Sequence, residues 1–161
     1  MIRPININIL FLLILFFSSC GFKPIYKSTE NSLNSEIFAI EFLNDPGYLI
    51  KSKILEEYDY SSSQNQYTIH LGTNQQSVPL ITNTDGTVSK YRIEVIIAFN
   101  VIKSNSENKI YEDISRGFAE YHVQTSEIET SEKRKQAIEI ATQEAVQMMS
   151  IKIQSNIVHA P

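Results

Sequence analysis

Apolar and polar residues alternate in several parts of the chain, and this alternation predicts a β-sheet. The longest run covers residues 88–102, where nearly every second side chain is apolar. This two-residue period is typical of a strand that buries one face. Shorter runs with the same period cover residues 37–43 and 67–71. Residues 103–109 form a polar turn, and residues 110–123 after it are a second long strand in pattern. We therefore expect a sheet of about four strands.

Turn-forming residues set the expected boundaries of one further extended piece. Residues 77–82 are extended in pattern, but Pro79 has no backbone N–H, which confines the piece to an edge or an irregular strand. The Asp-Gly pair within residues 83–87 predicts a turn between this piece and the long strand that follows.

The apolar pattern of the last expected strand changes phase along its length. Ile110, Ile114 and Phe118 share one phase, and we expect them to face the core. The expected inward phase then shifts to Tyr121 and Val123, and because the shift falls beside Gly117, it predicts a β-bulge there.

Two segments carry apolar residues at helical spacing. The first ends at Tyr58 and has Pro46 at its first helical position, behind an Asn or Asp cap. The second is 20 or more residues long. Ser126 and Glu129 form a capping-box pattern at its start, and Thr130 or Ser131 offers a second possible start. Its expected buried stripe comprises Ile138, Ala141, Ala145, Met148, Met149 and Ile153.

Together these elements predict a single α+β domain over residues 36–158. We expect a two-layer sandwich in which two helices pack on one face of a mostly antiparallel sheet. The other face of the sheet keeps Ile96, Ala98 and Ile102 beside charged residues. This face is more apolar than contact with water requires, which indicates a binding partner.

The N-terminus has the pattern of an export signal. Arg3 and the amino group precede nine apolar residues, from Ile9 to Phe17. A permanent bilayer span needs about 20 apolar residues, so a cleaved signal is the better interpretation. We expect residues 1–19 to be removed when the protein enters an oxidising compartment.

Cys20 is the only cysteine in the chain, so no disulfide can form within it. It directly follows the small residues Ser18 and Ser19, an arrangement that resembles a bacterial lipobox, in which the cysteine thiol is acylated. The alternatives are a soluble protein cleaved after Ser19 or a buried free cysteine. Acyl chains, at roughly 0.8 kcal/mol per buried methylene, would hold the protein on a membrane. The mostly polar residues 20–35 would then form a lipidated tether.

Composition argues against several classes of function. Lys and Arg total 14 against 18 for Asp and Glu in 161 residues, and this acidic balance argues against nucleic-acid binding. His70, His122 and His159 are not at metal-ligand spacing, and the chain has neither a nucleophile elbow nor a glycine-rich phosphate loop. We therefore expect no catalytic residue, no metal site and no cofactor, and hence no enzyme.

Three cations form a candidate anion-binding cluster. Lys90 and Arg92 are two residues apart and project from the same strand face, and Lys103 lies just past the end of the strand. Such a cluster can pair with phosphate groups of an anionic ligand. The alternative is that these are ordinary outward charges neutralised by Glu94 and its strand neighbours.

The heptapeptide CGFKPIY, residues 20–26, resembles the start of mature LptE-type lipopolysaccharide-assembly lipoproteins. The order of expected strands and helices agrees with that family over nearly the whole mature chain. The resemblance implies an α+β domain that sits as a plug inside the β-barrel of the outer-membrane protein LptD. It also implies that the protein assists assembly of LptD and helps deliver lipopolysaccharide to the outer leaflet.

The same resemblance implies roles for individual residues. Cys20 would be the lipid anchor, and Gly21 fits outer-membrane sorting because it is not the Asp that retains lipoproteins at the inner membrane. The domain would face the periplasm, and Lys90, Arg92 and Lys103 become candidates for contact with lipopolysaccharide phosphates. A different periplasm-facing outer-membrane lipoprotein, such as a secretion pilot or a small-ligand binding module, stays the alternative.

Overall fold

A computed structural model describes residues 38–58, 66–104 and 108–158 of the chain. The expected signal, residues 1–19, and the expected tether, residues 20–35, lie outside the described residues. Cys20 and His159 therefore lie outside them as well.

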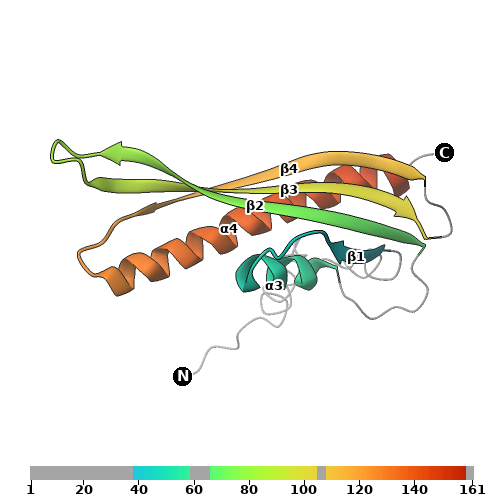
Figure 1. Cartoon of the computed structure of the whole chain (residues 1–161), viewed down its shortest axis with the longest axis horizontal. Helices are drawn as coiled ribbons and strands as arrows, with labels where there is room; N and C mark the ends of the chain where they lie inside the picture. The colour runs from blue at the N-terminus through green and yellow to red at the C-terminus, as the bar shows by residue number, and fades with distance from the viewer. Residues whose placement is uncertain (1–37, 59–65, 105–107, 159–161) are drawn as a thin grey trace, which may run out of the picture.

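The described residues form one four-stranded sheet with two helices, which confirms the α+β prediction. The strands lie in sequence order across the sheet, β1 parallel to β2 and the other pairs antiparallel. Figure 1 shows α4 running along the sheet, with α3 beside β1. The elements are β1 (Phe38–Phe42), α3 (Tyr48–Glu57), β2 (Tyr67–Thr82), β3 (Val88–Lys103), β4 (Lys109–His122), α4 (Glu127–Ile153) and a π-helical turn, η1 (Gln154–Val158).

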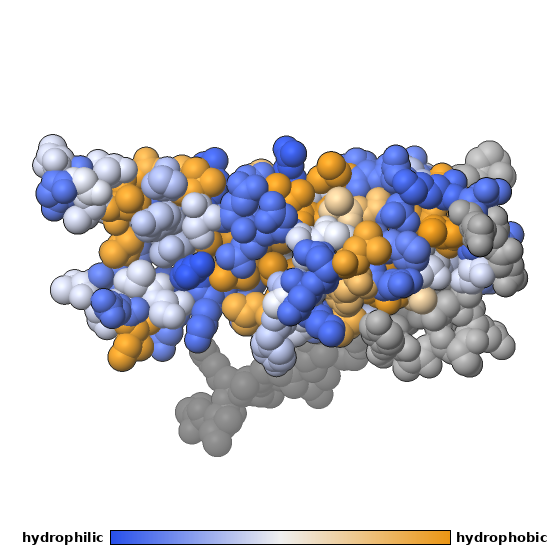
Figure 2. All heavy atoms as spheres, viewed as in Figure 1, coloured by the Kyte–Doolittle hydropathy of each residue, from blue (hydrophilic) through white to orange (hydrophobic). Residues whose placement is uncertain are grey.

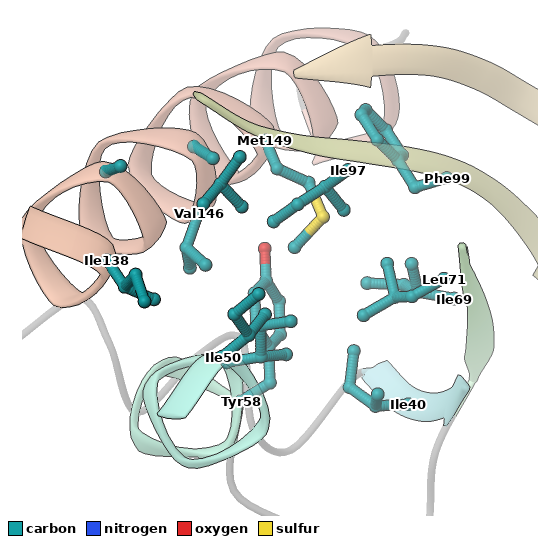
Figure 3. Close-up of a cluster of buried hydrophobic side chains, with 14 of the residues drawn as sticks. Ile40, Ile50, Tyr58, Ile69, Leu71, Ile97, Phe99, Ile138, Val146 and Met149 are labelled. Carbon is teal, nitrogen blue, oxygen red and sulfur yellow. The ribbon is translucent and has the colours of Figure 1, made fainter. Parts of the chain in front are cut away.

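The core lies between the sheet and the two helices. Figure 3 shows Ile50 of α3 and Tyr58 at the end of that helix facing Val146 and Met149 of α4. Each fully buried side chain of this size stabilises the fold by about 1.5 to 3 kcal/mol relative to exposure. From the sheet side, the core is completed by the alternating apolar residues of the first three strands: Phe38, Ile40, Ile69, Leu71, Ile93, Val95, Ile97, Phe99 and Val101.

The two expected extended pieces between residues 67 and 82 are one continuous strand, β2. Pro79 is accommodated because β1 pairs only with the first part of β2, as far as Leu71, so the second part of the strand is a sheet edge. The edge position expected for Pro79 is therefore confirmed, although the strand is not interrupted before it. The ladder with β3 is irregular only beyond Pro79.

The prediction of which β4 side chains face the core is wrong for the first part of the strand, although Tyr121 is buried as expected. Ile110 and Ile114 are each 48% exposed and Phe118 is 42% exposed, whereas the opposite phase, which includes Ser115 and Gly117, faces α4. No bulge occurs at Gly117, since the register with β3 is unbroken around it. The small residues face inward because α4 lies almost in contact with the β4 backbone, and apolar side chains occupy the outer face instead.

The expected helix starts are only partly correct. Helix α3 begins at Tyr48 with Gly47 as N-cap at φ 75°, so Pro46 lies before the helix. Asn44 does not cap it but forms two hydrogen bonds with the backbone of Thr73 in β2. A contact with a distant strand therefore uses the Asn44 side chain, which the local capping rule assigned to the helix.

The start of α4 has the expected N-cap residue but not the expected capping bond. Ser126 is the N-cap, yet its side chain makes no capping hydrogen bond. Instead, the hydroxyl oxygen of Thr130 accepts a hydrogen bond from the backbone N–H of Gln124 at 2.9 Å. The expected buried stripe of α4 is confirmed, except that Met148 is 43% exposed.

A buried hydrogen bond joins α3 to α4 and should show strong coupling. The Tyr58 hydroxyl lies 2.7 Å from Oγ of Ser150, and burial raises the pKa of Tyr58 well above its usual range. We expect Tyr58→Phe and Ser150→Ala each to lower the free energy of unfolding by about 1 to 2 kcal/mol, because each leaves one buried hydroxyl unpaired. The double variant should cost clearly less than the sum in urea unfolding, and additive losses would contradict the prediction.

Candidate functional site

The sheet face opposite α3 and α4, here called the outer face, carries an apolar row across three strands. Gly72, Ala98 and Ile114 are register partners on β2, β3 and β4, so their side chains lie side by side. Because Gly72 and Ala98 are small, the surface is hollowed there, in a depression of about 280 Å³. The lining of this depression is mostly apolar and comprises Leu43, Asn44, Gly72, Thr73, Asn74, Ile96 and Ala98.

The apolar surface continues around β4 onto α4. Ile114 shares a second hollow with Met148 and Lys152 at the junction between β4 and α4. On the adjoining exposed side of α4, Ile151 is 59% exposed and Ile140 is 51% exposed. Figure 2 shows hydrophobic side chains reaching the surface between hydrophilic ones. Within the described residues, two adjoining sides of the domain therefore present apolar groups to their surroundings.

Charged side chains cover the free edge of β4. The N–H of Phe118 donates to Oε2 of Glu144 at 2.6 Å, and Nζ of Lys152 donates to the carbonyl oxygen of Ile114 at 2.7 Å. Asp113 accepts from the N–H of Ile114 and from Lys152. The hydrogen bond from Lys152 is the largest cause that lowers the pKa of Asp113 to about 2. The middle of this edge, around Ile114 and Phe118, is thus blocked against further strand pairing.

A small ionic cluster of Lys90, Arg92 and Glu120, here called the cationic corner, lies on the outer face near the start of β3. Glu120 of β4 is the register partner of Arg92, and its carboxylate binds Nζ of Lys90 at 2.5 Å and Nη2 of Arg92 at 2.9 Å. These two cations lower the pKa of Glu120, Lys90 having the larger effect. A hollow of about 480 Å³ is lined here by Arg92, Phe118, Ala119 and Glu120.

The cationic corner retains donors for a further anion. Lys90 and Arg92 together carry two positive charges against one negative charge on Glu120, and the Arg92 side chain is 44% exposed. A guanidinium has five N–H donors and an ammonium three, so one carboxylate does not saturate them. Phe118 beside them adds an apolar surface. The arrangement suits an amphiphile with a phosphate group, provided that it competes with or binds alongside Glu120.

Lys103 does not belong to this cluster. It ends β3, eleven residues beyond Arg92, which corresponds to roughly 36 Å along a strand. Of the three cations singled out from the sequence, the structure brings together only Lys90 and Arg92. Their partner is Glu120 rather than Glu94, whose nearest cation is Arg116 at 3.9 Å. Only the register of β3 with β4 places Glu120 there, because 28 residues separate it from Arg92 along the chain.

The described part of the chain holds no other arrangement that suggests chemistry. His70 contacts Glu41 at 3.1 Å, and no group of three or more His, Cys, Asp or Glu side chains could bind a metal among the described residues. None of the helices that the structure describes is long and apolar enough to cross a membrane.

Comparison with solved structures finds proteins of similar fold. A rare lipoprotein B from Shewanella oneidensis superposes with a TM-score of 0.55 and 12% identity over 75% of this chain and 96% of that one. A minor lipoprotein from Acinetobacter baumannii gives 0.56 and 12% over 76% and 92%. A proposed lipoprotein from Caulobacter crescentus gives 0.64 and 9% over 81% and 98%.

At these identities the likeness concerns the fold. No family model and no curated protein sequence matches the chain. The chain therefore shares its α+β fold, over nearly the whole length of the compared structures, with bacterial lipoproteins that include a rare lipoprotein B.

Proposed function

We propose that this chain is an outer-membrane lipoprotein, anchored through Cys20 and facing the periplasm, that assists lipopolysaccharide assembly as plug and assembly partner of the LptD β-barrel. The observation that carries the proposal is the exposed apolar surface on the outer face and around β4. The heptapeptide at residues 20–26 and the fold shared with lipoproteins support it. A protein that only bound a small ligand would need one pocket, not two apolar sides.

A barrel interior suits this surface better than a flat partner does. A plug touches its partner on several sides, and the exposed apolar residues lie on both the outer face and the flank formed by α4. Their apolar groups alternate with charged pairs such as Glu94 with Arg116. Such a mixture is typical of an interface whose partners are exposed to water before they associate. The blocked middle of the β4 edge hinders the plug from pairing with barrel strands on that side.

Co-purification tests the proposal. The full chain, solubilised from membranes in mild detergent, should carry a large β-barrel protein with it, identified as LptD by mass spectrometry. A monodisperse protein without a barrel partner refutes the proposal and favours a secretion pilot or a small-ligand binding module.

The lipid anchor makes a separate prediction. We expect metabolic labelling with a palmitate analogue to modify the wild-type chain and to be abolished by Cys20→Ala, because no other cysteine is present to be acylated. Cys20→Ala should also move the protein from the membrane fraction to the soluble fraction, since the loss of acyl chains removes most of its membrane affinity. Equal labelling of the two proteins would show that Cys20 is not the modified residue.

Lipopolysaccharide contact at the cationic corner makes the next prediction. We expect Lys90→Ala with Arg92→Ala to weaken lipopolysaccharide binding by roughly tenfold at low salt, because two charge-assisted hydrogen bonds are lost. Glu120→Gln should strengthen binding by about two- to fivefold, because it frees both cations from their partner. The effects should shrink in high salt.

The control removes two cations elsewhere. Lys133→Ala with Lys135→Ala changes the net charge equally, but on the exposed side of α4. Binding by this control should match the wild type in a titration of lipopolysaccharide followed by intrinsic fluorescence or calorimetry. If the Lys90 and Arg92 double variant also binds like the wild type at low and high salt, the corner is a structural ion pair only.

A further inference from the structure

Strand β2 has one edge that is paired throughout and one that is not. β3 pairs with β2 from Tyr67 to Thr82, whereas β1 pairs with the other edge only as far as Leu71. Asn44 continues the pairing on this second edge as far as Thr73, since its side chain donates to the carbonyl oxygen of Thr73 at 2.7 Å and accepts from the N–H of Thr73 at 2.9 Å. Beyond Thr73, the strand order places no other strand of the described chain against this edge.

The backbone groups that remain on this edge can be identified. In an antiparallel ladder, the N–H and C=O groups of alternate residues point to opposite edges. Because those of Thr73 bind Asn44, those of Gln75 and Ser77 point to the same open edge, and the register with β3 is regular through Pro79. Pro79 adds a carbonyl oxygen there, and its missing N–H costs the β2–β3 ladder nothing.

The β4 edge and the β2 edge differ in whether charged side chains block them. The middle of the β4 edge is blocked by two side chains, since Glu144 accepts a hydrogen bond from Phe118 and Lys152 donates one to Ile114. Native sheets avoid pairing with other chains in this way. On β2, the chain from residue 71 to residue 84 contains no ionisable side chain, although 20% of the whole sequence is charged. Val78 and Ile81 on this segment are 38% and 48% exposed. Thus the usual charged blocker is missing from the part of the β2 edge that no described strand pairs.

The chemistry of the edge specifies its occupant. N–H and C=O groups that no described strand pairs are matched, at this spacing, by an extended backbone, and an edge without charges suits an uncharged segment. A second copy of this chain fits poorly, because so short a ladder falls far below the ~800 Å² per partner that a stable interface buries. The edge instead adjoins the hollow of the outer face, since Asn74 lines that hollow and Gln75 is the next residue. One partner can therefore cover both.

We infer that the edge of β2 from Gln75 to Pro79 accepts an extended, uncharged segment of the barrel partner by strand addition. This inference rests on the proposed function for the identity of the partner. Backbone pairing gives the segment its direction and register, and Val78 and Ile81 add apolar contacts. The plug is then held by hydrogen bonds at one edge and by apolar contact over the outer face.

Residue-resolved amide hydrogen exchange on the full chain, alone and in the complex co-purified with the barrel, tests the inference. The N–H groups of Gln75 and Ser77 should exchange at least about tenfold more slowly in the complex. Those of Gln76 and Val78 already point to β3 and should change little. Protection of these amides by docking of side chains alone would not follow this alternation.

A proline variant supplies the second measurement. Ser77→Pro removes an N–H from the open edge and none from the β2–β3 ladder, so it should lower the amount of barrel recovered by about fivefold or more, while Ser77→Ala recovers the wild-type amount. If Ser77→Pro fails to fold, the exchange of wild-type amides still decides. A recovered barrel with no alternating protection overturns the inference and leaves the proposed function intact. A wild-type chain without any barrel overturns both, and protection that appears in a dimer of the chain alone assigns the edge to a second copy.

Discussion

Gly117→Ala is expected to destabilise the protein by more than about 3 kcal/mol, or to prevent its folding, although it adds only a methyl group. A Cβ atom at position 117 would lie 1.9 Å from the carbonyl oxygen of Ala141 and 2.6 Å from the backbone nitrogen of Ala145. Both atoms belong to the backbone of α4, so no side-chain rotation can relieve the clash. The helix would have to move away from β4, and the buried Ala141 and Ala145 would lose their contacts with the sheet.

The matched control is the same substitution at another strand glycine. At Gly72 the nearest atom to an added Cβ is the carbonyl oxygen of Ala98 at 3.9 Å, an ordinary contact. We expect Gly72→Ala to change the free energy of unfolding by less than about 1 kcal/mol, and to stabilise if it changes anything, since alanine restricts the unfolded chain. Urea unfolding of the purified variants measures both. Equal, small effects at the two positions would show that α4 does not lie against β4 as described.

Ala98→Asp is expected to reduce recovery of the barrel partner by at least tenfold while leaving the fold intact. Ala98 is exposed in the centre of the outer face, between Gly72 and Ile114, so a carboxylate there is solvated in the free protein. In a complex that covers the outer face, the same carboxylate would be buried without a partner, which costs several kcal/mol. The measurement is the amount of barrel that co-purifies with equal amounts of each variant.

Two controls separate docking from general effects. Ala98→Ser keeps the position small and uncharged and should recover the wild-type amount of barrel. Ile128→Asp places the same new charge on an apolar residue that is 74% exposed in the first turn of α4, where a carboxylate is favourable to the helix. If Ala98→Asp recovers as much barrel as these controls do, the outer face is not the docking surface.

Local patterns were sufficient for most of the elements. The two-residue period located β1 and β3 within a residue or two, because both strands alternate strongly in hydrophobicity. The polar turn before β4 located that strand equally well. The 3.6-residue period located the buried stripe of α4 for the same reason. The α+β class followed from the order of these elements, since one helix and then a closing helix must cover a meander of strands.

The orientation of β4 required the neighbouring element. A strand with apolar residues in both phases has no preferred face in its own sequence, and the larger set, Ile110, Ile114 and Phe118, is the exposed one. The choice is made by α4, whose small residues approach the β4 backbone so closely that only Ser115, Gly117 and similar residues fit between them. The exposed set then becomes part of the proposed docking surface.

The candidate site shows the same division. That Lys90 and Arg92 share a strand face follows from their spacing, but the register of β4 decides that Glu120 holds both and that Phe118 lies beside them. Asn44 likewise reads as a helix cap in the sequence and closes the edge of β2 in the fold.

By itself, the sequence determined the order of strands and helices and the apolar character of both sheet faces, because each depends on residues close together in the chain. It also predicts an export signal that ends before Cys20. Only the tertiary structure decided which face of β4 is covered, which carboxylate meets the two cations and which sheet edge stays open. These outcomes depend on contacts between residues that are tens of positions apart, such as Gly117 with Ala141. Their energies come from close packing and strand register, which no local period encodes.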